Sequence, residues 1–295
     1  MPAWRELSAQ AGASELFRHE GCLYFYREKM PPDNGDWGSR LREELGIRPQ
    51  RLTSAEVAAL EPALPPSAGG LLFEDAAHIV DPSALTRGLT VAALSQGASF
   101  QRARVERIAE QTNGQIRLTC REATIDARTA VIAAGVWSRP LAQEGGENVP
   151  LDTERGYHIE FLVDTSPIRR PVSPIDLGFY VTPMVGRLRV AGTVEMGGLS
   201  APPDPKRIAL LERGVRKLLP NLGPVHAQWL GFRPSMPDSL PVIGRSRRYP
   251  NLIFAFGHGH LGMTLAGVTR RRVADMIELR NDVPDLVAFR PDRFG

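Results

Sequence analysis

The stretch NLIFAFGHGHLG, Asn251 to Gly262, joins an apolar run to a glycine-rich loop. The apolar run has the length and composition of a buried strand, and the residues after the loop, MTLAGVTRRRVADMIEL, have the pattern of a helix. The loop spells G-x-G-x-x-G, the spacing with which a strand, a loop and a helix N-terminus hold a dinucleotide pyrophosphate. This loop either opens a Rossmann unit or has another task.

A Rossmann unit requires a second parallel strand after the helix, with an acidic residue at its end for the ribose. Glu278 has about the right spacing, roughly 20 residues beyond the loop, but it falls within the predicted helix. The residues that follow, NDVPDLVAFRPDRFG, contain no buried strand. The sequence therefore argues against a Rossmann unit at this position.

The loop keeps its physical properties without that unit. Glycines at 257, 259 and 262 allow positive φ and a close approach of the backbone to a ligand. The helix N-terminus supplies N–H groups and a partial positive charge, which stabilise a phosphate or negative charge on a flavin ring. A glycine-rich turn without a ligand is the alternative. His258 and His260 have no further ligand cluster beside them, so we predict no metal site.

The rest of the chain combines two patterns. AVIAAG (Ala130–Gly135) lacks polar alternation, which predicts a fully buried parallel strand. Asp81 and Pro82 have the types and order that begin a helix. Residues 151–200 alternate as antiparallel strands do, and residues 231–244 are predicted to form an extended Pro/Gly loop. We therefore predict an α/β fold with an α+β part built on an antiparallel sheet.

Composition and charge exclude several classes of protein. The chain has 295 residues, 42% hydrophobic and 23% charged, a balance typical of globular proteins. A net charge of +3 with only short basic clusters gives no basis for nucleic-acid binding. Cys22 and Cys120 form no disulfide or zinc pattern and suit a reducing compartment. No run approaches the ~18 apolar residues of a membrane helix, and no secretion signal is visible, so we expect a cytoplasmic location.

Several motifs taken together resemble one known family. They are GFRPSMPDSLPVIG (231–244), NLIFAFGHGHLGMTLA (251–266), AVIAAGVWS (130–138), ERGYHIEF (154–161), GFYVTP (178–183) and FRPDRF (289–294). In order and spacing they resemble the FAD-dependent D-amino acid oxidase and dehydrogenase family, especially its bacterial D-amino acid dehydrogenase branch. The combination of GFRP, PDxxPxIG and GHGHxGxT is specific, whereas each motif alone is weak.

The resemblance implies two interleaved units. The substrate domain, with a mainly antiparallel sheet, is expected at residues 1–74 and 147–237, and the FAD-binding domain at residues 75–146 and 238–295. Family members begin with a strand, a G-x-G-x-x-G loop, a helix and a second strand that bind the ADP half of FAD. Roughly the first 100 residues, about one βαβ module with its continuation, have no counterpart here. We expect an incomplete FAD-binding domain, explained by truncation, a misassigned start or a partner subunit that supplies the module.

The implied reaction is oxidative deamination of an amino acid. A hydride passes from the α-carbon to flavin N5, and the imino acid hydrolyses to a keto acid and ammonia. Arg233 in GFRP matches the family's carboxylate-binding arginine, a task that suits its planar fork; the alternative is a surface pair with Asp238. Tyr180 matches a tyrosine that assists the carboxylate, while Tyr157 and His158 are predicted to line the pocket or orient the flavin. For these three residues a structural role is the alternative, and we name no catalytic base.

The resemblance also assigns contacts with FAD. The C-terminal loop matches the family's flavin-contacting loop, mainly through backbone N–H groups, at Gly257, Gly259, His260, Leu261, Gly262, Met263 and Thr264. Gly135 and Trp137 match a second contact at the carboxyl edge of the sheet, where ligands of open α/β sheets gather. Val105 matches a valine whose backbone meets adenine, with an ordinary strand residue as the alternative. Gly244 is predicted to let its loop pass close to the ring, and Arg155 is predicted as a surface charge.

Two functions follow as alternatives. One is FAD-dependent oxidation of D-amino acids, with D-hydroxyproline or another secondary amine as the neighbouring substrate. Its electron acceptor would be oxygen, a quinone or a protein, and contact with the inner membrane through that acceptor stays open. The other is a non-catalytic remnant or binding subunit that does not hold FAD alone. In that case uncovered sheet edges and helix faces favour association with a partner subunit or oligomer.

Overall fold

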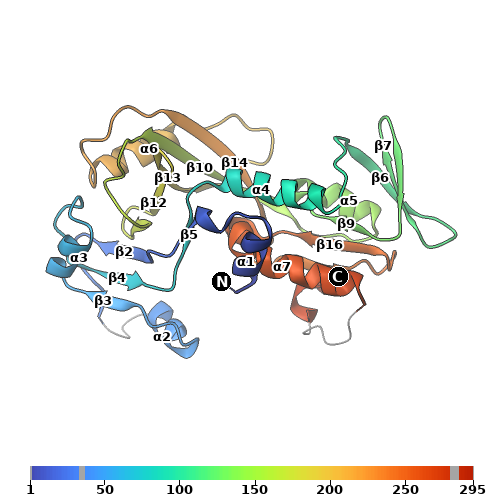
Figure 1. The fold of residues 1–295 in the computed structure, drawn as a ribbon, viewed down its shortest axis with the longest axis horizontal. Coiled ribbons are helices and arrows are strands. Elements are labelled where there is room, and N and C mark those ends of the chain that lie inside the picture. The colour runs from blue at the N-terminus through green and yellow to red at the C-terminus, as the bar shows by residue number, and fades with distance from the viewer. Residues whose placement is uncertain (1, 33–36, 280–285, 295) are drawn as a thin grey trace.

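The computed structural model describes residues 2–32, 37–279 and 286–294, which form two lobes (Figure 1). One lobe is built on a large, mainly antiparallel sheet, and the other on a smaller sheet that contains a parallel strand pair. Helices α1 (Pro2–Gln10), α4 (Pro82–Ser95) and α7 (Gly262–Ile277) occupy the middle of the molecule. The predicted α/β class, with an antiparallel sheet in one part, is confirmed.

The large sheet has the strand order β14-β10-β13-β12-β11-β2-β4-β3. Its pairs are antiparallel except for β11 with β2. The strands span Cys22–Tyr26 (β2), Gln50–Leu52 (β3), Gly69–Phe73 (β4), Asp152–Leu162 (β10), Val172–Pro174 (β11), Phe179–Met184 (β12), Arg187–Glu195 (β13) and Ala227–Ser235 (β14). Helix α6 (Pro205–Arg216) packs on one face, where alternate strand side chains such as Phe25, Ile159 and Val190 form the main core with Leu211.

The smaller lobe contains β15 (Val242–Arg245), β16 (Leu252–Phe256) and β9 (Ala130–Ile132), in that sheet order. β16 and β9 run parallel, and β15 is antiparallel to β16. A meander precedes β9, and helix α5 follows it; their elements are β6 (Val105–Glu110), β7 (Ile116–Cys120), β8 (Thr124–Ala127) and α5 (Ser138–Glu144). The two sheets share a second core with α5, so this lobe has its own apolar interior.

Helices α1, α4 and α7 share a third apolar cluster. Trp4 and Leu85 are buried in it, and Ala266 of α7 packs against them. The indole Nε1 of Trp4 donates a hydrogen bond to the carbonyl of Met263 at 2.8 Å, which ties α1 to the start of α7. The predicted division assigned residues 1–74 to the substrate domain, whereas α1 packs against α4 and α7. The division into two units itself stays a prediction.

The remaining elements are short. Strand β1 (Phe17–Arg18) pairs with β5 (His78–Ile79), and the helices α2 (Trp37–Glu44) and α3 (Ser54–Leu60) lie in the large lobe. 3-10 turns follow β9 and β16 as η2 (Gly135–Trp137) and η3 (Gly259–Leu261). These two turns lie where the predicted FAD contacts gather.

Two predictions about β structure were wrong. Residues 231–235 and 242–244, predicted as parts of one loop, belong to β14 and β15, and Pro234 of β14 lies opposite Thr153. β14 is the edge strand of the large sheet, and an edge tolerates proline because the missing N–H can face away from the partner strand. β9 is not fully buried, since Val131 is 39% exposed and only its neighbours Ala130 and Ile132 point into the core.

Candidate active site

One face of the large sheet carries a row of side chains that the strand register aligns. Trp229 of β14 lies opposite His158 of β10, His158 opposite Ala191 of β13, and Ala191 opposite Tyr180 of β12. Because side chains alternate along a strand, this row lies on the face opposite α6 and the main core. The register therefore places two of the predicted substrate-binding residues, His158 and Tyr180, on one surface.

Arg233 lies on the same face of β14. Its guanidinium lies against Gly156 of β10, since a Cβ added to Gly156 would come within 2.3 Å of Nη2. Nη1 donates a hydrogen bond to the carbonyl of Thr193 at 3.1 Å. Asp238, the partner considered from the sequence, instead pairs with Arg293 at 2.7 Å. Within the part of the chain that the structure describes, Arg233 makes no close ion pair. Burial lowers the pKa of this half-buried cation, although the carboxylate of Glu154, opposite it on β10, acts in the other direction.

Tyr180 lies three strands away from Arg233. Its hydroxyl donates a hydrogen bond to the hydroxyl of Tyr24 on β2 at 3.1 Å. Burial raises the pKa of Tyr180 strongly, and the neighbouring Tyr24 raises it further. The phenol therefore stays neutral throughout the physiological pH range and can act only as a neutral hydrogen-bonding group.

His158 is stacked on Trp229, with ring centroids 5.0 Å apart and 21° between the planes. Burial lowers the pKa of His158 to about 4, with Arg189 adding to the effect, although the carboxylate of Glu160 opposes it. The imidazole is therefore uncharged near neutral pH. Together with the indole it offers a flat, neutral surface on the exposed side of the sheet.

Tyr157 does not join this face. It is 2% exposed and lies in the main core, and its hydroxyl donates to a carboxylate oxygen of Glu195 at 2.6 Å. The strand alternation itself separates it from His158, because neighbouring residues of a strand point to opposite faces. Applied to RGYH, this rule would have shown that the two side chains could not line the same pocket.

The two glycine loops meet at the carboxyl edge of the parallel strands β9 and β16. Gly135 follows β9 with φ 57°, and Gly259 follows β16 with φ 54°. Both values lie in the left-handed region, which favours glycine. A Cβ added to Gly135 would meet no atom within 4 Å, and one added to Gly259 would meet only Oγ of Ser235, at 3.7 Å. The loops therefore present open backbone at this edge.

Helix α7 begins in the second loop. No side chain caps its first N–H groups, so these donors and the positive end of the helix dipole remain available. The side chains around this start are exposed at His260, Leu261, Met263 and Thr264, with Gly262 as the first helical residue. Gly257 has φ 83° and packs against Met236. Open left-handed glycines beside an uncapped helix N-terminus fit the phosphate and ring of a flavin nucleotide.

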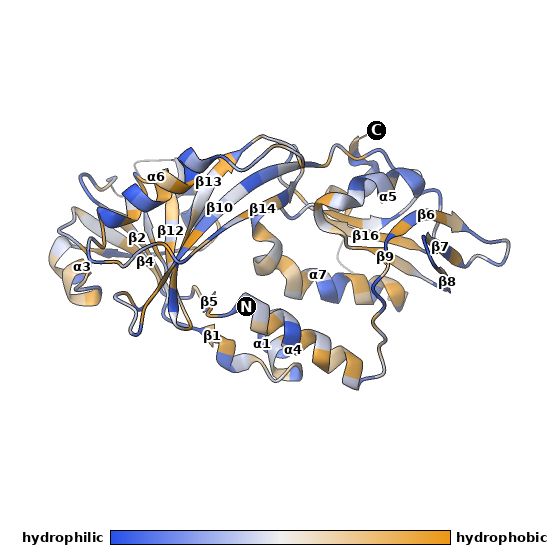
Figure 2. Cartoon of the chain, turned by 90° about the horizontal axis from the view of Figure 1, so that it is seen from above, coloured by the Kyte–Doolittle hydropathy of each residue, from blue (hydrophilic) through white to orange (hydrophobic). Residues whose placement is uncertain are grey.

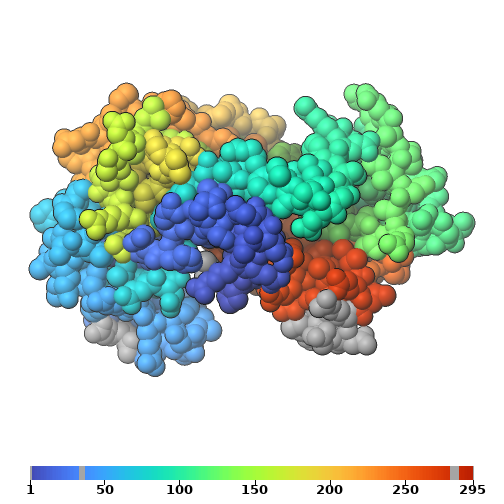
Figure 3. Space-filling model, in the orientation of Figure 1, coloured from blue at the N-terminus to red at the C-terminus, as the bar shows by residue number. Residues whose placement is uncertain are grey.

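β14 connects the sheet face with both loops. It contacts η2 and η3, and the ring of Phe232 meets that of Trp137 edge-on with centroids 6.3 Å apart. Figure 2 shows α7 extending away from β14, and Figure 3 shows a notch between the two lobes at the lower edge of the view. Arg233 thus lies on the same strand segment as the residues that contact the two loops.

Two predicted cofactor residues lie elsewhere. Val105 is half-buried at the start of β6 in the meander. Gly244 lies in β15, and a Cβ added there would come within 3.1 Å of Pro291. The close neighbour of Gly244 is therefore the C-terminal FRPDRF segment, while contact of either residue with FAD stays a prediction.

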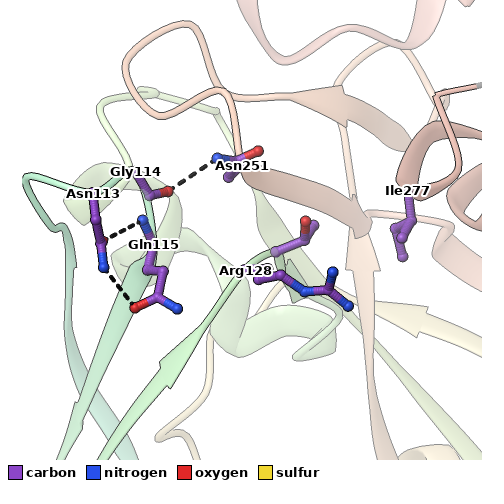
Figure 4. Close-up of a pocket in the computed structure, with 7 residues that line it drawn as sticks. Asn113, Gly114, Gln115, Arg128, Asn251 and Ile277 are labelled. Atoms are coloured by element: carbon purple, nitrogen blue, oxygen red, sulfur yellow. Dashed lines mark hydrogen bonds between the residues drawn. The ribbon is translucent and has the colours of Figure 1, made fainter.

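A cavity of about 650 Å³ lies at the other end of the small sheet (Figure 4). Its lining includes Asn113, Arg128 and Asn251, and the amide of Asn251 donates to the carbonyl of Gly114 at 3.0 Å. Asn251 and Thr129 directly precede β16 and β9, so the cavity is at the amino ends of these strands. It contains none of the residues predicted to bind substrate or cofactor.

This geometry agrees with what comparison with known proteins finds. Residues 1–276 match the family described as FAD dependent oxidoreductase, also called DAO. The chain belongs to this family. The DAO family uses FAD, and the chain is accordingly an FAD-dependent oxidoreductase. Among the described residues, no helix combines the length and apolar character needed to cross a membrane.

Several relatives in the DAO family have the names of enzymes that act on amino acids. A D-amino-acid oxidase of Bradyrhizobium diazoefficiens is 34% identical over 98% of this chain and 70% of its own length. A D-amino acid dehydrogenase of Paramagnetospirillum magneticum is 30% identical with the same coverage. Glycine oxidase from Geobacillus kaustophilus has a similar structure, with a TM-score of 0.87 and 25% identity over 99% of this chain and 80% of that one. The chain is thus related to FAD-dependent amino acid oxidoreductases.

Proposed function

We propose that this chain oxidises D-amino acids with FAD and that Arg233 binds the substrate carboxylate. The observation that carries the proposal is the half-buried guanidinium of Arg233, which has no ion-pair partner among the described residues. Glu154, opposite Arg233 on β10, supplies a nearby negative charge but no close ion pair, so the guanidinium keeps N–H groups for a ligand. A planar guanidinium binds a carboxylate through two parallel hydrogen bonds. The likeness to a D-amino-acid oxidase and a D-amino acid dehydrogenase supports the substrate class.

The residues of this chain would bind and orient the reactants. Arg233 holds the carboxylate, and Tyr180, whose raised pKa keeps it neutral, would turn its hydroxyl from Tyr24 to the substrate and add a hydrogen bond on the same face. The open backbone at Gly135 and Gly259 and the N-terminus of α7 would hold FAD, with the exposed loop residues beside them. Bound FAD would accept a hydride from the α-carbon, which leaves an imino acid for hydrolysis by water.

A visible spectrum of the purified chain with added FAD tests the proposal. We expect flavin bands that D-alanine bleaches under anaerobic conditions and L-alanine does not. D-proline and glycine test the neighbouring substrates, and reoxidation by oxygen or by a quinone identifies the acceptor. A chain that retains no flavin bands once unbound FAD has been removed would instead support a binding subunit that requires a partner.

Arg233→Lys tests the carboxylate contact. Lysine keeps the positive charge but cannot form the two parallel hydrogen bonds, so KM for D-alanine should rise about tenfold to a hundredfold, as expected for losing 1.5–3 kcal/mol of a charge-assisted hydrogen bond. The flavin spectrum and the melting temperature should change little. An unchanged KM would refute the assigned role of Arg233.

A further inference from the structure

Strand β13 carries a bulge directly beside Arg233. The register of β10 and β13 shifts between Arg155 and Tyr157, so that two residues of β13, Thr193 and Val194, lie opposite Gly156. Thr193 has φ 62°, and its Oγ1 is buried with no hydrogen-bond partner in the described part of the chain. A β-branched residue is strained in this conformation, and such strain persists only where the surroundings hold it.

A largely buried ionic cluster holds the strand immediately after the bulge: Arg155 is fully buried, and the Glu195 side chain is 19% exposed. Glu195 accepts a hydrogen bond from the Tyr157 hydroxyl at 2.6 Å and lies 3.3 Å from Nε of Arg155. Arg155, predicted as a surface charge, is fully buried and donates to the carbonyl of Pro202 at 3.0 Å. The Tyr157 hydroxyl also accepts from the N–H of Asp204 at 2.9 Å. Removal of one member would leave a buried polar group unpaired, so the cluster resists displacement of Glu195.

The bulge presents one group to the substrate-binding face. The carbonyl of Thr193 accepts the hydrogen bond from Nη1 of Arg233 at 3.1 Å, while the guanidinium lies against the bare Gly156. A guanidinium has five N–H donors in one plane. With Nη1 held by the carbonyl, the edge formed by Nε and Nη2 remains for a bidentate carboxylate.

We propose that Tyr157 and Glu195 are positioning residues, which hold the strained bulge so that the carbonyl of Thr193 orients the Arg233 guanidinium toward substrate. This inference rests on the proposed function of Arg233. Without the cluster, Thr193 would relax to an ordinary strand conformation and its carbonyl would turn away from Nη1. Tyr157, which lies on the wrong face to touch substrate, then still acts on substrate affinity through Arg233.

A binding experiment with an unreactive ligand tests this inference. Isobutyrate has the carboxylate of an amino acid and no amine, and isobutyramide is its uncharged counterpart. Calorimetry with FAD in excess should show Tyr157→Phe weakening isobutyrate binding several-fold to about thirtyfold, the range for residues that modulate a site indirectly. Isobutyramide binding should not change. In turnover, KM for D-alanine should rise more than kcat falls.

A rescue variant separates positioning from a general loss of structure. Glycine adopts φ 62° without strain, so Thr193→Gly should preserve the bulge without help from the cluster. We therefore expect Tyr157→Phe combined with Thr193→Gly to recover most of the isobutyrate affinity. Glu61→Gln is the matched control, because Glu61, like Glu195, is a carboxylate that lies beside an arginine, here Arg170 at 2.8 Å, and it is remote from β13 in the sheet order. It should lower the melting temperature and leave isobutyrate affinity unchanged.

A double-mutant cycle with Arg233→Lys decides the outcome. If the cluster acts through the guanidinium, Tyr157→Phe should cost little further affinity once Arg233 is replaced. Equal losses in both backgrounds, or a Tyr157→Phe variant with unchanged affinity, would overturn the inference. If Arg233→Lys alone leaves isobutyrate binding unchanged, the proposed function fails instead. Should Tyr157→Phe not fold, the isosteric Glu195→Gln carries the same expectations.

Discussion

At the scale of single residues, the site depends on glycines, which leave room for neighbouring side chains. The guanidinium of Arg233 fits over β10 only because position 156 has no Cβ. Gly231, directly opposite Gly156, likewise leaves room for the indole of Trp229, since a Cβ there would come within 2.0 Å of its ring. The guanidinium and the indole thus lie on backbone that these two glycines leave uncovered. A motif search for charged residues would not select either glycine.

Gly156→Ala should displace Arg233. The added Cβ would come within 2.3 Å of Nη2, so the guanidinium must move by about 1 Å, and a misplacement of that size costs up to about a hundredfold in rate. We expect kcat/KM for D-alanine to fall about tenfold to a hundredfold. Gly223→Ala is the control, because a Cβ at Gly223 meets nothing within 4 Å. Equal kinetics in the two variants would contradict the placement of Arg233.

At the scale of elements, the helices α4 and α7 differ in whether a side chain caps their first turn. The predicted cap of α4 is confirmed: Oδ1 of Asp81 accepts hydrogen bonds from the N–H groups of Ser83 and Ala84, both at 3.0 Å. The start of α7, in contrast, has no side-chain cap. One helix is thus closed by its own sequence, while the other keeps donors that the proposed FAD site would use.

The loop before α7 should respond differently to alanine at its two glycines. Gly259 has φ 54°, so Gly259→Ala should lower the free energy of unfolding by about 1 kcal/mol without FAD. Gly262 has helical angles, and an added Cβ would make only an ordinary contact with His258 at 3.8 Å, so Gly262→Ala should have no cost or a small gain. Urea denaturation of the two variants measures the difference. Equal stabilities would contradict the left-handed conformation of Gly259.

The cap of α4 gives a second test. Asp81→Ala leaves two N–H groups without their acceptor and should cost about 1 kcal/mol of unfolding free energy. Asp81→Asn keeps a cap of nearly equal quality and should recover most of that loss. Chemical denaturation of both variants is the measurement. A loss of similar size in Asp81→Asn would assign the effect to the charge beside Arg187, 4.0 Å away, rather than to the cap.

At the scale of the whole molecule, three partly or fully buried histidines make the stability of the fold depend on pH. Burial lowers the pKa of His78 in β5, His158 in β10 and His258 before η3 below the ordinary value of 6.5. For each group the unfolded chain binds a proton at a higher pH than the folded chain does. The stability that these three groups contribute is therefore complete above pH 6.5 and falls as the pH decreases below it.

The melting temperature should accordingly fall between pH 6.5 and pH 4, the interval between the ordinary pKa of histidine and the value of about 4 for His158. The carboxylates with lowered pKa values, such as Asp81 and Asp238, add their loss only at lower pH. His158→Gln should flatten the first decline, whereas replacement of the exposed His19 should not. A melting temperature that is constant from pH 7 to pH 5 would contradict this account.

The sequence by itself determined the elements whose signals are local. The strand, glycine loop and helix at residues 251–279, the helix start at Asp81, and the antiparallel region follow from periodicity and turn chemistry, and all are present. Local signals suffice there because each residue's conformation depends on its own side chain and near neighbours. The family motifs likewise located Arg233 and the glycine loops.

The tertiary structure decided what depends on register and burial. That GFRP is an edge strand, that Tyr157 faces the core, and that Arg155 is buried beside Glu195 depend on which strands pair and on where β13 bulges. A shift of one residue would move each of these side chains to the other face. Pairing joins segments far apart in the chain, and its free energy comes from packing across the whole sheet, so no local pattern could select it.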